Sequence, residues 1–489
     1  MTTACFEQLT LFKVEKQQVT VDFCGGDVVS DAGLLSVREF DKQLGILSGL
    51  AERFPDPRSQ KDITYTSENL LTQRVYQILA DYPDANDAQT LRHNPLFKTL
   101  ADVSPSEDST LASGSTLNRF HYAFTRRQAN VPIEDRDVLL ECQDALNGRL
   151  TLSNQYLVDL FMRTRTKRPN YIIIDLDATD DPTHGQQTLS LFHGFYDQYQ
   201  YYPLLAFDGE SGFPLASWLR VGTAHASWGA VDTLEQIVTT LRQQWPDLMI
   251  IVRGDSGFSV PELIDYCEAE ALYYCFGYAS NEVLKRKTED ALNDLQTYYN
   301  FYSHREPSVQ RFERYEDYQA GSWSAPRSIL AKIEINRQGT NRRFVVTNMS
   351  GHPQGLYHGF YVKRGDVPER SIGELKNGLH ADRLSQSGFR ANAMRLLEHT
   401  MAYAITVLYR EAAASVPEMA RAEVSTWRSR LWKVGAVVRT STRRIWFHFS
   451  TTWPYRELWQ RVHEAVTDYL EQLLTPRTVL PQPRPTMPM

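Results

Sequence analysis

Apolar residues recur with helical spacing through the first third of the sequence. The pattern runs over residues 31–50, where Asp31 can cap the first turn, and again over residues 67–84. Residues 111–124 hold a Gly-Ser turn followed by a short helix, a pattern found in helix-turn-helix units and more often in ordinary helical hairpins. We therefore predict a mainly helical region over residues 1–165.

Short apolar runs replace this pattern between residues 171 and 278. The first run, Tyr171–Asp177, predicts a buried strand with a polar end. Four further strands are predicted at 201–207, 213–221, 248–253 and 273–278, with helices at 230–244 and 261–271. A hairpin followed by two parallel crossovers is the strand order of a ribonuclease-H-like sheet, whereas a doubly wound fold alternates from the start. The predicted fold class is therefore α/β, with a ribonuclease-H-like mixed sheet at its core.

The pattern changes twice more along the chain. Residues 286–349 are polar and Tyr-rich and predict a β-rich insertion with a hairpin formed by residues 328–335 and 343–347, whereas residues 366–411 are strongly helical. The Pro-rich stretch 476–489 predicts a disordered tail. The predicted regions are 1–165, helical; 166–285, first part of the core; 286–349, insertion; 350–412, last part of the core; and 413–489, C-terminal.

Composition narrows the class of protein. The chain has 489 residues, of which 42% are hydrophobic and 23% charged, which excludes bulk disorder. No apolar run is long enough to span a bilayer, and the N-terminus lacks the pattern of a secretory signal. The five cysteines are scattered without a CxxC pair, so neither a disulfide framework nor a zinc ribbon is expected. We expect a protein without membrane contact in a reducing cytoplasm.

The formal charge of −7 hides a basic C-terminal region. Residues 421–489 carry eleven Lys or Arg against five Asp or Glu, and tryptophans at 427, 432, 446 and 453 lie among the arginines. Basic residues with interleaved aromatics suit a phosphate backbone, although a solvated surface and core tryptophans explain the pattern equally well. The N-terminal helical region and this basic region are therefore both candidates for DNA binding.

Three acids can be brought together by the predicted fold. Asp177 ends the first strand, Asp255 follows the fourth, and Glu369 begins the late helix. In a ribonuclease-H-like sheet the first and fourth strands are parallel neighbours, roughly 4.8 Å apart. Three carboxylates there would repel one another, and two Mg²⁺ ions would cancel that repulsion. Such a pair of ions activates a water or a 3′-hydroxyl for attack on a phosphodiester.

Each acid also has a structural explanation. Asp177 can be a turn residue with Asp175 on the same strand face, and Asp255 can pair with Arg253. Glu369 can complete a capping box that begins at Asp366. For any one acid the structural role is the more common outcome. Their joint placement on this strand order favours a metal site formed by all three.

These motifs resemble those of bacterial DDE insertion-sequence transposases, group 1, in the insertion-sequence family thirteen-eighty. The resemblance covers about residues 34–444 and centres on Arg-Gly-Asp-Ser-Gly-Phe at residues 253–258. Asp177 and Thr179 resemble the strand-end Asp-x-Thr of that family. Its third signature, Tyr-x₂-Arg-x₃-Glu-x₆-Lys, corresponds here to Tyr361, Arg364, Glu369 and Lys376, with four residues instead of three between Arg and Glu.

The unusual gap leaves Glu374 as a rival third acid. Glu374 follows Arg370 by the spacing of the family. Glu369 and Lys376 lie on one helix face, whereas Glu374 lies some 140° around the helix from Glu369, so only one of the two acids can face a metal pair. We expect Glu369, with Lys376 on the same face for a phosphate.

The resemblance implies several further roles. DNA contacts are expected from Tyr361, Arg364, Lys376, Arg220, His225, Arg253 and Arg383, although a surface salt-bridge set explains Tyr361, Arg364 and Lys376 about as well. His184 is more readily explained as a loop histidine than as a metal ligand. The insertion would serve hairpin formation and end binding, and Trp323 would either stack on a flipped base or belong to the core. The implied cofactor is Mg²⁺, as two ions that Mn²⁺ can replace.

The sequence thus predicts a cut-and-paste DNA transposase in the bacterial nucleoid. It would act as a homodimer on double-stranded DNA, namely terminal inverted repeats and target DNA. One alternative is a nucleotide-sugar glycosyltransferase that uses Asp175 and Asp177 as an Asp-x-Asp metal motif, which leaves Asp255, Glu369 and the basic region unexplained. The other is a non-catalytic DNA-binding protein descended from a transposase.

Overall fold

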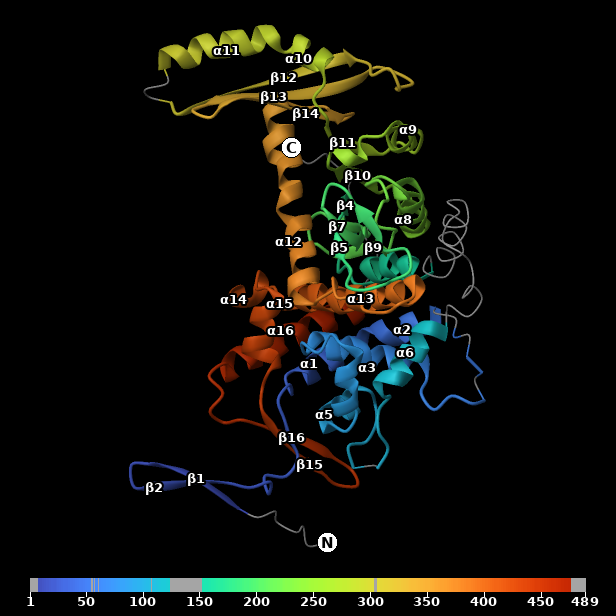
Figure 1. Cartoon of the computed structure of the whole chain (residues 1–489), viewed down its shortest axis with the longest axis vertical. Coiled ribbons are helices and arrows are strands. Elements are labelled where there is room, and N and C mark those ends of the chain that lie inside the picture. Colours follow the sequence, from blue (N-terminus) through green and yellow to red (C-terminus); the bar gives the residue numbers. More distant parts are fainter. Residues whose placement is uncertain are drawn as a thin grey trace. The chain divides into compact units, whose positions relative to one another are not determined.

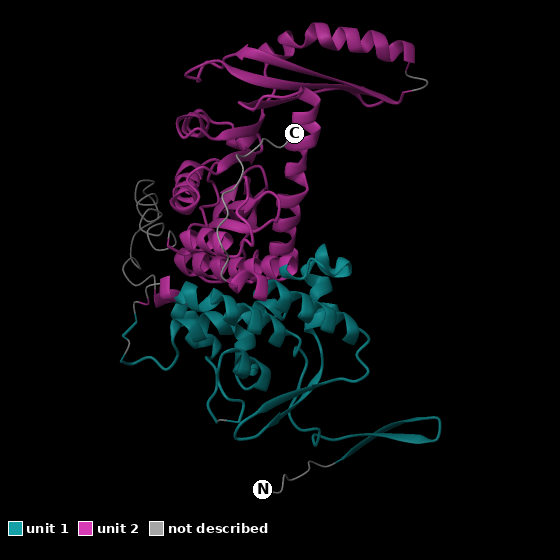
Figure 2. Ribbon diagram, turned by 180° about the vertical axis from the view of Figure 1, so that it is seen from behind, with its two compact units in different colours: residues 1–51, 58–120, 412–470 teal, residues 52–57, 121–411, 471–489 magenta. Residues whose placement is uncertain are grey.

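A computed structural model describes residues 8–475, apart from residues 54–55, 57, 60, 107, 124–151 and 303–305 (Figure 1). The chain folds into two compact units (Figure 2). The first comprises residues 1–51, 58–120 and 412–470, and the second comprises residues 52–57, 121–411 and 471–489. The predicted disordered tail lies outside the described residues.

An eight-stranded mixed sheet forms the framework of the second unit. Its order is β12-β13-β14-β11-β10-β4-β8-β9 (Figure 1). Five of these strands match the predicted core: β4 Tyr171–Ala178, β8 Leu204–Asp208, β9 Pro214–Trp218, β10 Met249–Gly254 and β11 Tyr273–Tyr278. β8 pairs antiparallel with both β4 and β9, and β10 pairs parallel with both β4 and β11. The prediction that the first and fourth core strands are parallel neighbours is confirmed.

Helices cover both sides of these core strands. α8 (Ala230–Gln244) and α9 (Pro261–Ala269) lie on one side, and the long run that contains α12 lies on the other (Figure 1). The apolar face of α8 buries Leu234, Ile237 and Leu241, as the helical spacing of those residues requires. A small sheet, β5-β7-β6, follows β4 and consists of Asp181–Pro182, Gln198–Tyr201 and Leu191–His193.

The β-rich insertion extends the core sheet. The predicted hairpin is confirmed as β13 (Arg327–Asn336) and β14 (Gly339–Thr347), and β14 pairs antiparallel with β11. The long outer strand β12 (Ser308–Tyr318) and the helices α10 (Glu282–Lys287) and α11 (Glu289–Tyr302) were not predicted. Apolar residues of α11 pack on this end of the sheet, in a cluster that includes Leu295, Val309 and Ile333.

An irregular helical run follows the insertion. It begins with a π-helical segment Gly355–Tyr361 and a 3₁₀ turn Val362–Gly365, continues as α12 (Val367–Gly373), and ends with a second π-helical segment Glu374–Gly378. The buried helix α13 (Phe389–Ala412) comes after a break at residues 379–388. The predicted helical stretch 366–411 is thus two helices.

The first unit combines both ends of the described sequence. Its helices include α1 Leu34–Leu44, α3 Ser67–Leu79, α4 Ala88–Leu91, α5 Pro95–Leu100, α14 Pro417–Ala420 and α15 Val424–Trp427. Three further helices cross its boundaries: α2 Ile46–Arg53, α6 Gly114–Ala123 and α16 Arg456–Leu474. Its strands are β1 Leu9–Val14, β2 Gln17–Val21, β3 Val28–Val29, β15 Ala436–Thr440 and β16 Ile445–Phe449. Trp427 and Trp432 are core residues. Among the described residues, no helix has the length and apolar character needed to cross a bilayer.

Candidate active site

The pairing of β4 with β10 places two aspartates at one edge of the sheet. Arg253 on β10 lies opposite Asp175 on β4, so Asp255 and Asp177 follow two residues further along parallel neighbouring strands. Asp255 directly follows β10 and caps a short 3₁₀ turn, where its Oδ1 accepts the backbone N–H of Gly257 at 2.7 Å. Oδ1 of Asp177 accepts the N–H of Ala178 at 2.8 Å. Each carboxylate therefore has one oxygen held by the backbone beside it.

Burial and mutual repulsion make Asp177 reluctant to ionise. Removal from water raises the pKa of Asp177 from 3.8 to about 6, and the charge of Asp255 adds to the increase. Arg364 opposes it, because its Nη1 lies 3.6 Å from Oδ2 of Asp177. The structure thus brings Asp177 and Asp255 within electrostatic range and supplies one cation beside them.

Glu369 is not part of this pair. Its side chain is exposed on α12, and its carboxylate lies against the preceding turn, where a Cβ added to Gly365 would be 3.3 Å from Oε1 of Glu369. Glu374 is buried instead and forms an ion pair with Arg410, with 2.6 Å between Oε1 and Nη2. Within the described part of the chain, no three His, Cys, Asp or Glu side chains lie close enough together to hold a metal ion. The joint site of three acids stays a prediction.

Comparison with known proteins identifies the family of the chain. The family model for the transposase DDE domain, group 1, matches residues 12–470. The chain belongs to the DDE transposase family. No curated protein matches the sequence. A solved structure of a piggyBac transposase synaptic complex with hairpin DNA is similar at 11% identity and a TM-score of 0.41, covering 92% of this chain and 83% of that one.

Two of the predicted signature residues of this transposase, Tyr361 and Arg364, lie beside the aspartate pair. Tyr361 packs beside the Asp255 turn: a Cβ added to Gly277 would lie 2.5 Å from the Tyr361 hydroxyl and 2.9 Å from the Ser256 nitrogen, so only glycine fits there. Burial raises the pKa of Tyr361 to about 12, with Arg364 lowering it and Asp255 raising it. Tyr361 and Arg364 are thus neighbours of the pair.

Lys376 is tied to the segment that follows Asp177. Its Nζ lies 2.9 Å from both the Oδ1 and the backbone oxygen of Asp180. It also lies 3.4 Å from the hydroxyl of Thr179. The lysine therefore links the helical run of Glu369 to the end of β4. Sequence reasoning missed Asp180 as its partner, although the acid-rich run after β4 was a usable signal.

Two arginines expected to contact DNA are instead buried in the transposase. Arg253 is 1% exposed, and its guanidinium donates to both oxygens of Asp175 and to the carbonyl of Phe360. Arg220 is also 1% exposed, and within the described residues its guanidinium donates to backbone carbonyls alone. Direct DNA contact does not fit this burial. His225, His184 and Arg383 are exposed, and Trp323 is a core residue packed against Tyr278, Tyr318 and Arg327.

The donor set at the sheet edge suits a divalent cation. Members of the DDE family use divalent metal ions. Asp177 and Asp255 offer carboxylate oxygens, which Mg²⁺ and Mn²⁺ prefer as ligands. A bound cation would also relieve the repulsion between the two acids. Asp175 cannot serve as a second ligand on β4, because Arg253 occupies both of its oxygens; the Asp-x-Asp alternative therefore loses one of its two acids.

Proposed function

We propose that this transposase belongs to a bacterial insertion sequence and moves it by a cut-and-paste reaction. It would bind the terminal inverted repeats of its element as a homodimer and act on target DNA in the cytoplasm. The observation that carries the proposal is the register of β4 and β10, in which Arg253 lies opposite Asp175, so that Asp177 and Asp255 each stand two residues further on. The strand order β9-β8-β4-β10-β11, antiparallel on one side of β4 and parallel on the other, supports a ribonuclease-H-like core.

Asp177, Asp255 and Glu369 would hold two Mg²⁺ ions, which Mn²⁺ can replace. When bound, such ions activate water or a 3′-hydroxyl and stabilise the leaving oxygen of a phosphodiester. Burial raises the pKa of Asp177 to about 6, and Arg364 beside it favours the charged form of the carboxylate. A cation held by these acids would take over that role, and Arg364 would then be available to face a phosphate.

Glu369 must approach the aspartates for this site to be complete. The helical run around it supports such a shift, because it departs from α-helical geometry on both sides of α12. Local π and 3₁₀ geometry is common where a helix serves function. Glu369 is also exposed and therefore available, whereas Glu374 is bound to Arg410. We therefore propose Glu369 as the third acid.

DNA contacts are proposed for the exposed or half-exposed basic residues Arg364, Lys376, His225 and Arg383 and for Tyr361. The basic C-terminal region supports a second DNA-binding surface, because Arg439, Arg443 and Arg444 are exposed at β15, β16 and their connecting turn. The helical N-terminal region, residues 1–165, is proposed to bind DNA as well.

Cleavage of the element ends tests the proposal. The substrate is linear DNA that carries the repeats flanking the gene, with Mg²⁺ in the reaction. Wild-type protein should nick at the repeat ends, and Asp177→Asn and Asp255→Asn should bind the same DNA without cutting it. Asp247→Asn, at an exposed acid before β10, is the matched control and should cut normally. Normal cleavage by the Asp255 variant would rule the assignment out.

A further inference from the structure

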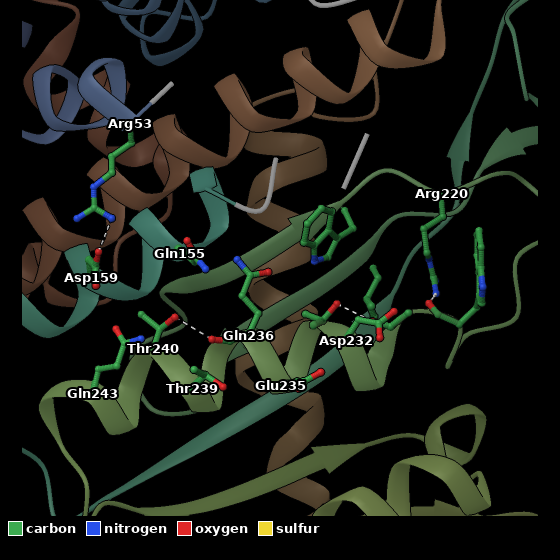
Figure 3. A pocket seen from close by; sticks show the side chains of 15 residues that line it. Arg53, Gln155, Asp159, Arg220, Asp232, Glu235, Gln236, Thr239, Thr240 and Gln243 are labelled. Carbon is green, nitrogen blue, oxygen red and sulfur yellow. Dashed lines mark hydrogen bonds and ion pairs between the residues drawn. The ribbon is translucent and has the colours of Figure 1, made fainter. Parts of the chain in front are cut away.

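Arg220 is a buried cation whose hydrogen bonds go to the main chain. It lies at the end of a cavity of about 430 Å³, opposite Arg53 (Figure 3). Burial lowers its pKa to about 9, and its Nη2 has no hydrogen-bond partner among the described residues. Burying a guanidinium without a carboxylate beside it is costly. A residue kept at such a cost is a candidate for a positioning role.

The guanidinium of Arg220 fixes the loop that follows it. Its Nε donates to the carbonyl of Tyr202 at 2.8 Å, which anchors it to the strand end beside it. Its Nη1 donates to three carbonyls of one loop, those of His225, Ala226 and Trp228, at 3.0, 2.9 and 2.7 Å. One planar side chain therefore sets the path of residues 225–228 relative to the end of β7.

That loop presses against the turn of Asp255. A Cβ added to Gly257 would lie 2.7 Å from the Cβ of Ala226, so the loop packs directly on this glycine. The N–H of Gly257 is the group that holds Oδ1 of Asp255. A displacement of Ala226 would therefore shift Gly257 and weaken the hydrogen bond that orients the Asp255 carboxylate.

We propose that Arg220 is a positioning residue for Asp255, acting through Ala226 and Gly257. The inference rests on the proposed role of Asp255 as a metal ligand. Groups that orient metal ligands are worth about 10- to 100-fold in metal affinity or activity. Lysine cannot replace Arg220, because a single ammonium lacks the planar fork that spans Tyr202 and the loop together.

The first test compares Arg220→Lys and Arg220→Gln with wild type. The half-saturating Mg²⁺ concentration for end cleavage should rise by about 10- to 100-fold. Mn²⁺ binding without DNA, followed by electron paramagnetic resonance, should weaken by a similar factor. Unchanged metal dependence in both assays would overturn the proposal. Weaker DNA binding with normal Mn²⁺ binding would also overturn it, because Arg220 would then serve DNA binding through the loop of His225.

The second test leaves Arg220 intact and so remains valid if its variants fail to fold. Gly257→Ala should raise the metal requirement, because the new methyl group would lie 2.7 Å from the Cβ of Ala226 and 3.0 Å from Oδ1 of Asp255. Adding Ala226→Gly to that variant should restore metal binding in part, because it removes the atom that this methyl group would strike. Failure of the double variant to improve on Gly257→Ala would contradict the coupling. If wild type binds Mn²⁺ but does not cleave, the proposed function fails while Mn²⁺ binding still decides the role of Arg220.

Discussion

Arg253 and Asp175 form a two-point ion pair inside the sheet, with Nε to Oδ1 and Nη2 to Oδ2 both at 2.6 Å. The two residues face each other on adjacent parallel strands. The pair therefore fixes the register of the two strands, and Asp177 and Asp255 each stand two residues beyond it. It explains why a basic residue stands two positions before one candidate metal ligand and an acid two positions before the other.

Breaking this pair should destabilise the second unit strongly. Arg253→Met leaves the Asp175 carboxylate buried and unpaired, which costs about 3–5 kcal/mol, and thermal melting should report the loss. Adding Asp175→Leu should recover much of that stability, because both charges are then gone. A double variant as unstable as the single one would show that the ion pair is not the source of the effect.

The two rival glutamates should respond in opposite ways. Glu369→Gln should abolish end cleavage with little change in melting, since this side chain is exposed. Glu374→Gln should destabilise the protein by about 3–5 kcal/mol, because Arg410 loses its buried partner. Near-normal cleavage by Glu369→Gln, together with inactivity of well-folded Glu374→Gln, would transfer the third position to Glu374.

Asp177 should make metal-free stability depend on pH. Its pKa is raised from 3.8 to about 6 in the folded protein, so the folded state holds this proton more tightly than the unfolded state. The stability linked to protonated Asp177 is present below about pH 4 and is lost as the pH rises to about 6. Asp177→Asn should therefore raise the free energy of unfolding at pH 8 by at most about 3 kcal/mol, seen as a higher melting temperature. At pH 3.5 it should leave the melting temperature unchanged.

The measurement is a melting curve in chelator at each pH, with Asp247→Asn as the control. A Mg²⁺-induced rise in melting temperature should occur in wild type and be smaller in the Asp177 variant. If Asp177→Asn changed the melting temperature equally at both pH values, the pKa of Asp177 would not be raised in the folded protein.

Variants of Lys376 and its partner Asp180 can distinguish a structural role of the lysine from DNA contact. If the lysine mainly ties the helical run to the end of β4, Asp180→Asn and Lys376→Met should slow cleavage alike, and the double variant should be no worse than either. If Lys376 also binds a phosphate, its variant alone should lower DNA affinity. Filter binding of the repeat DNA and cleavage rates distinguish the two outcomes.

The basic C-terminal region gives a prediction in the first unit. Replacing Arg443 and Arg444 by Gln should weaken DNA binding and reduce the slope of log affinity against log salt by about 1 for each phosphate that the protein no longer neutralises. Melting should not change, because both side chains are exposed. Arg428→Gln is the contrasting variant: it is buried, bonds the carbonyls of Ile78 and Leu79, and should lower stability.

The sequence predicted the core strands because their apolar runs are short and bounded by polar turns. The same local signal was too weak for β12, where aromatic residues stand at every third position among polar ones and only Val309 and Tyr318 are buried. Helical spacing alone did not reveal the irregular run around α12, because π and 3₁₀ turns preserve much of that spacing. A local sequence pattern could not predict the helix and strand boundaries that long-range packing determines.

The candidate site was predictable where residues are close in sequence to strand ends. Asp177 and Asp255 could be paired from strand order, and their pairing follows from the register. The burial of Arg220 and Arg253 could not be inferred, because their acceptors, such as the carbonyl of Phe360, come from distant parts of the chain. The partner of Glu374, Arg410, lies on another helix and left no signal near the motif.

The insertion cannot be trimmed away as an appendage. β14 supplies the hydrogen-bonding neighbour of β11 from Cys275 to Tyr278, and Leu330 and Val345 share one apolar cluster with Ile173 and Ile251. Deleting residues 306–349 would remove the hydrogen-bonding partner of β11 and expose an apolar, unpaired strand edge, which is prone to aggregation. Engineers who want a shorter enzyme would therefore have to graft a replacement strand onto β11.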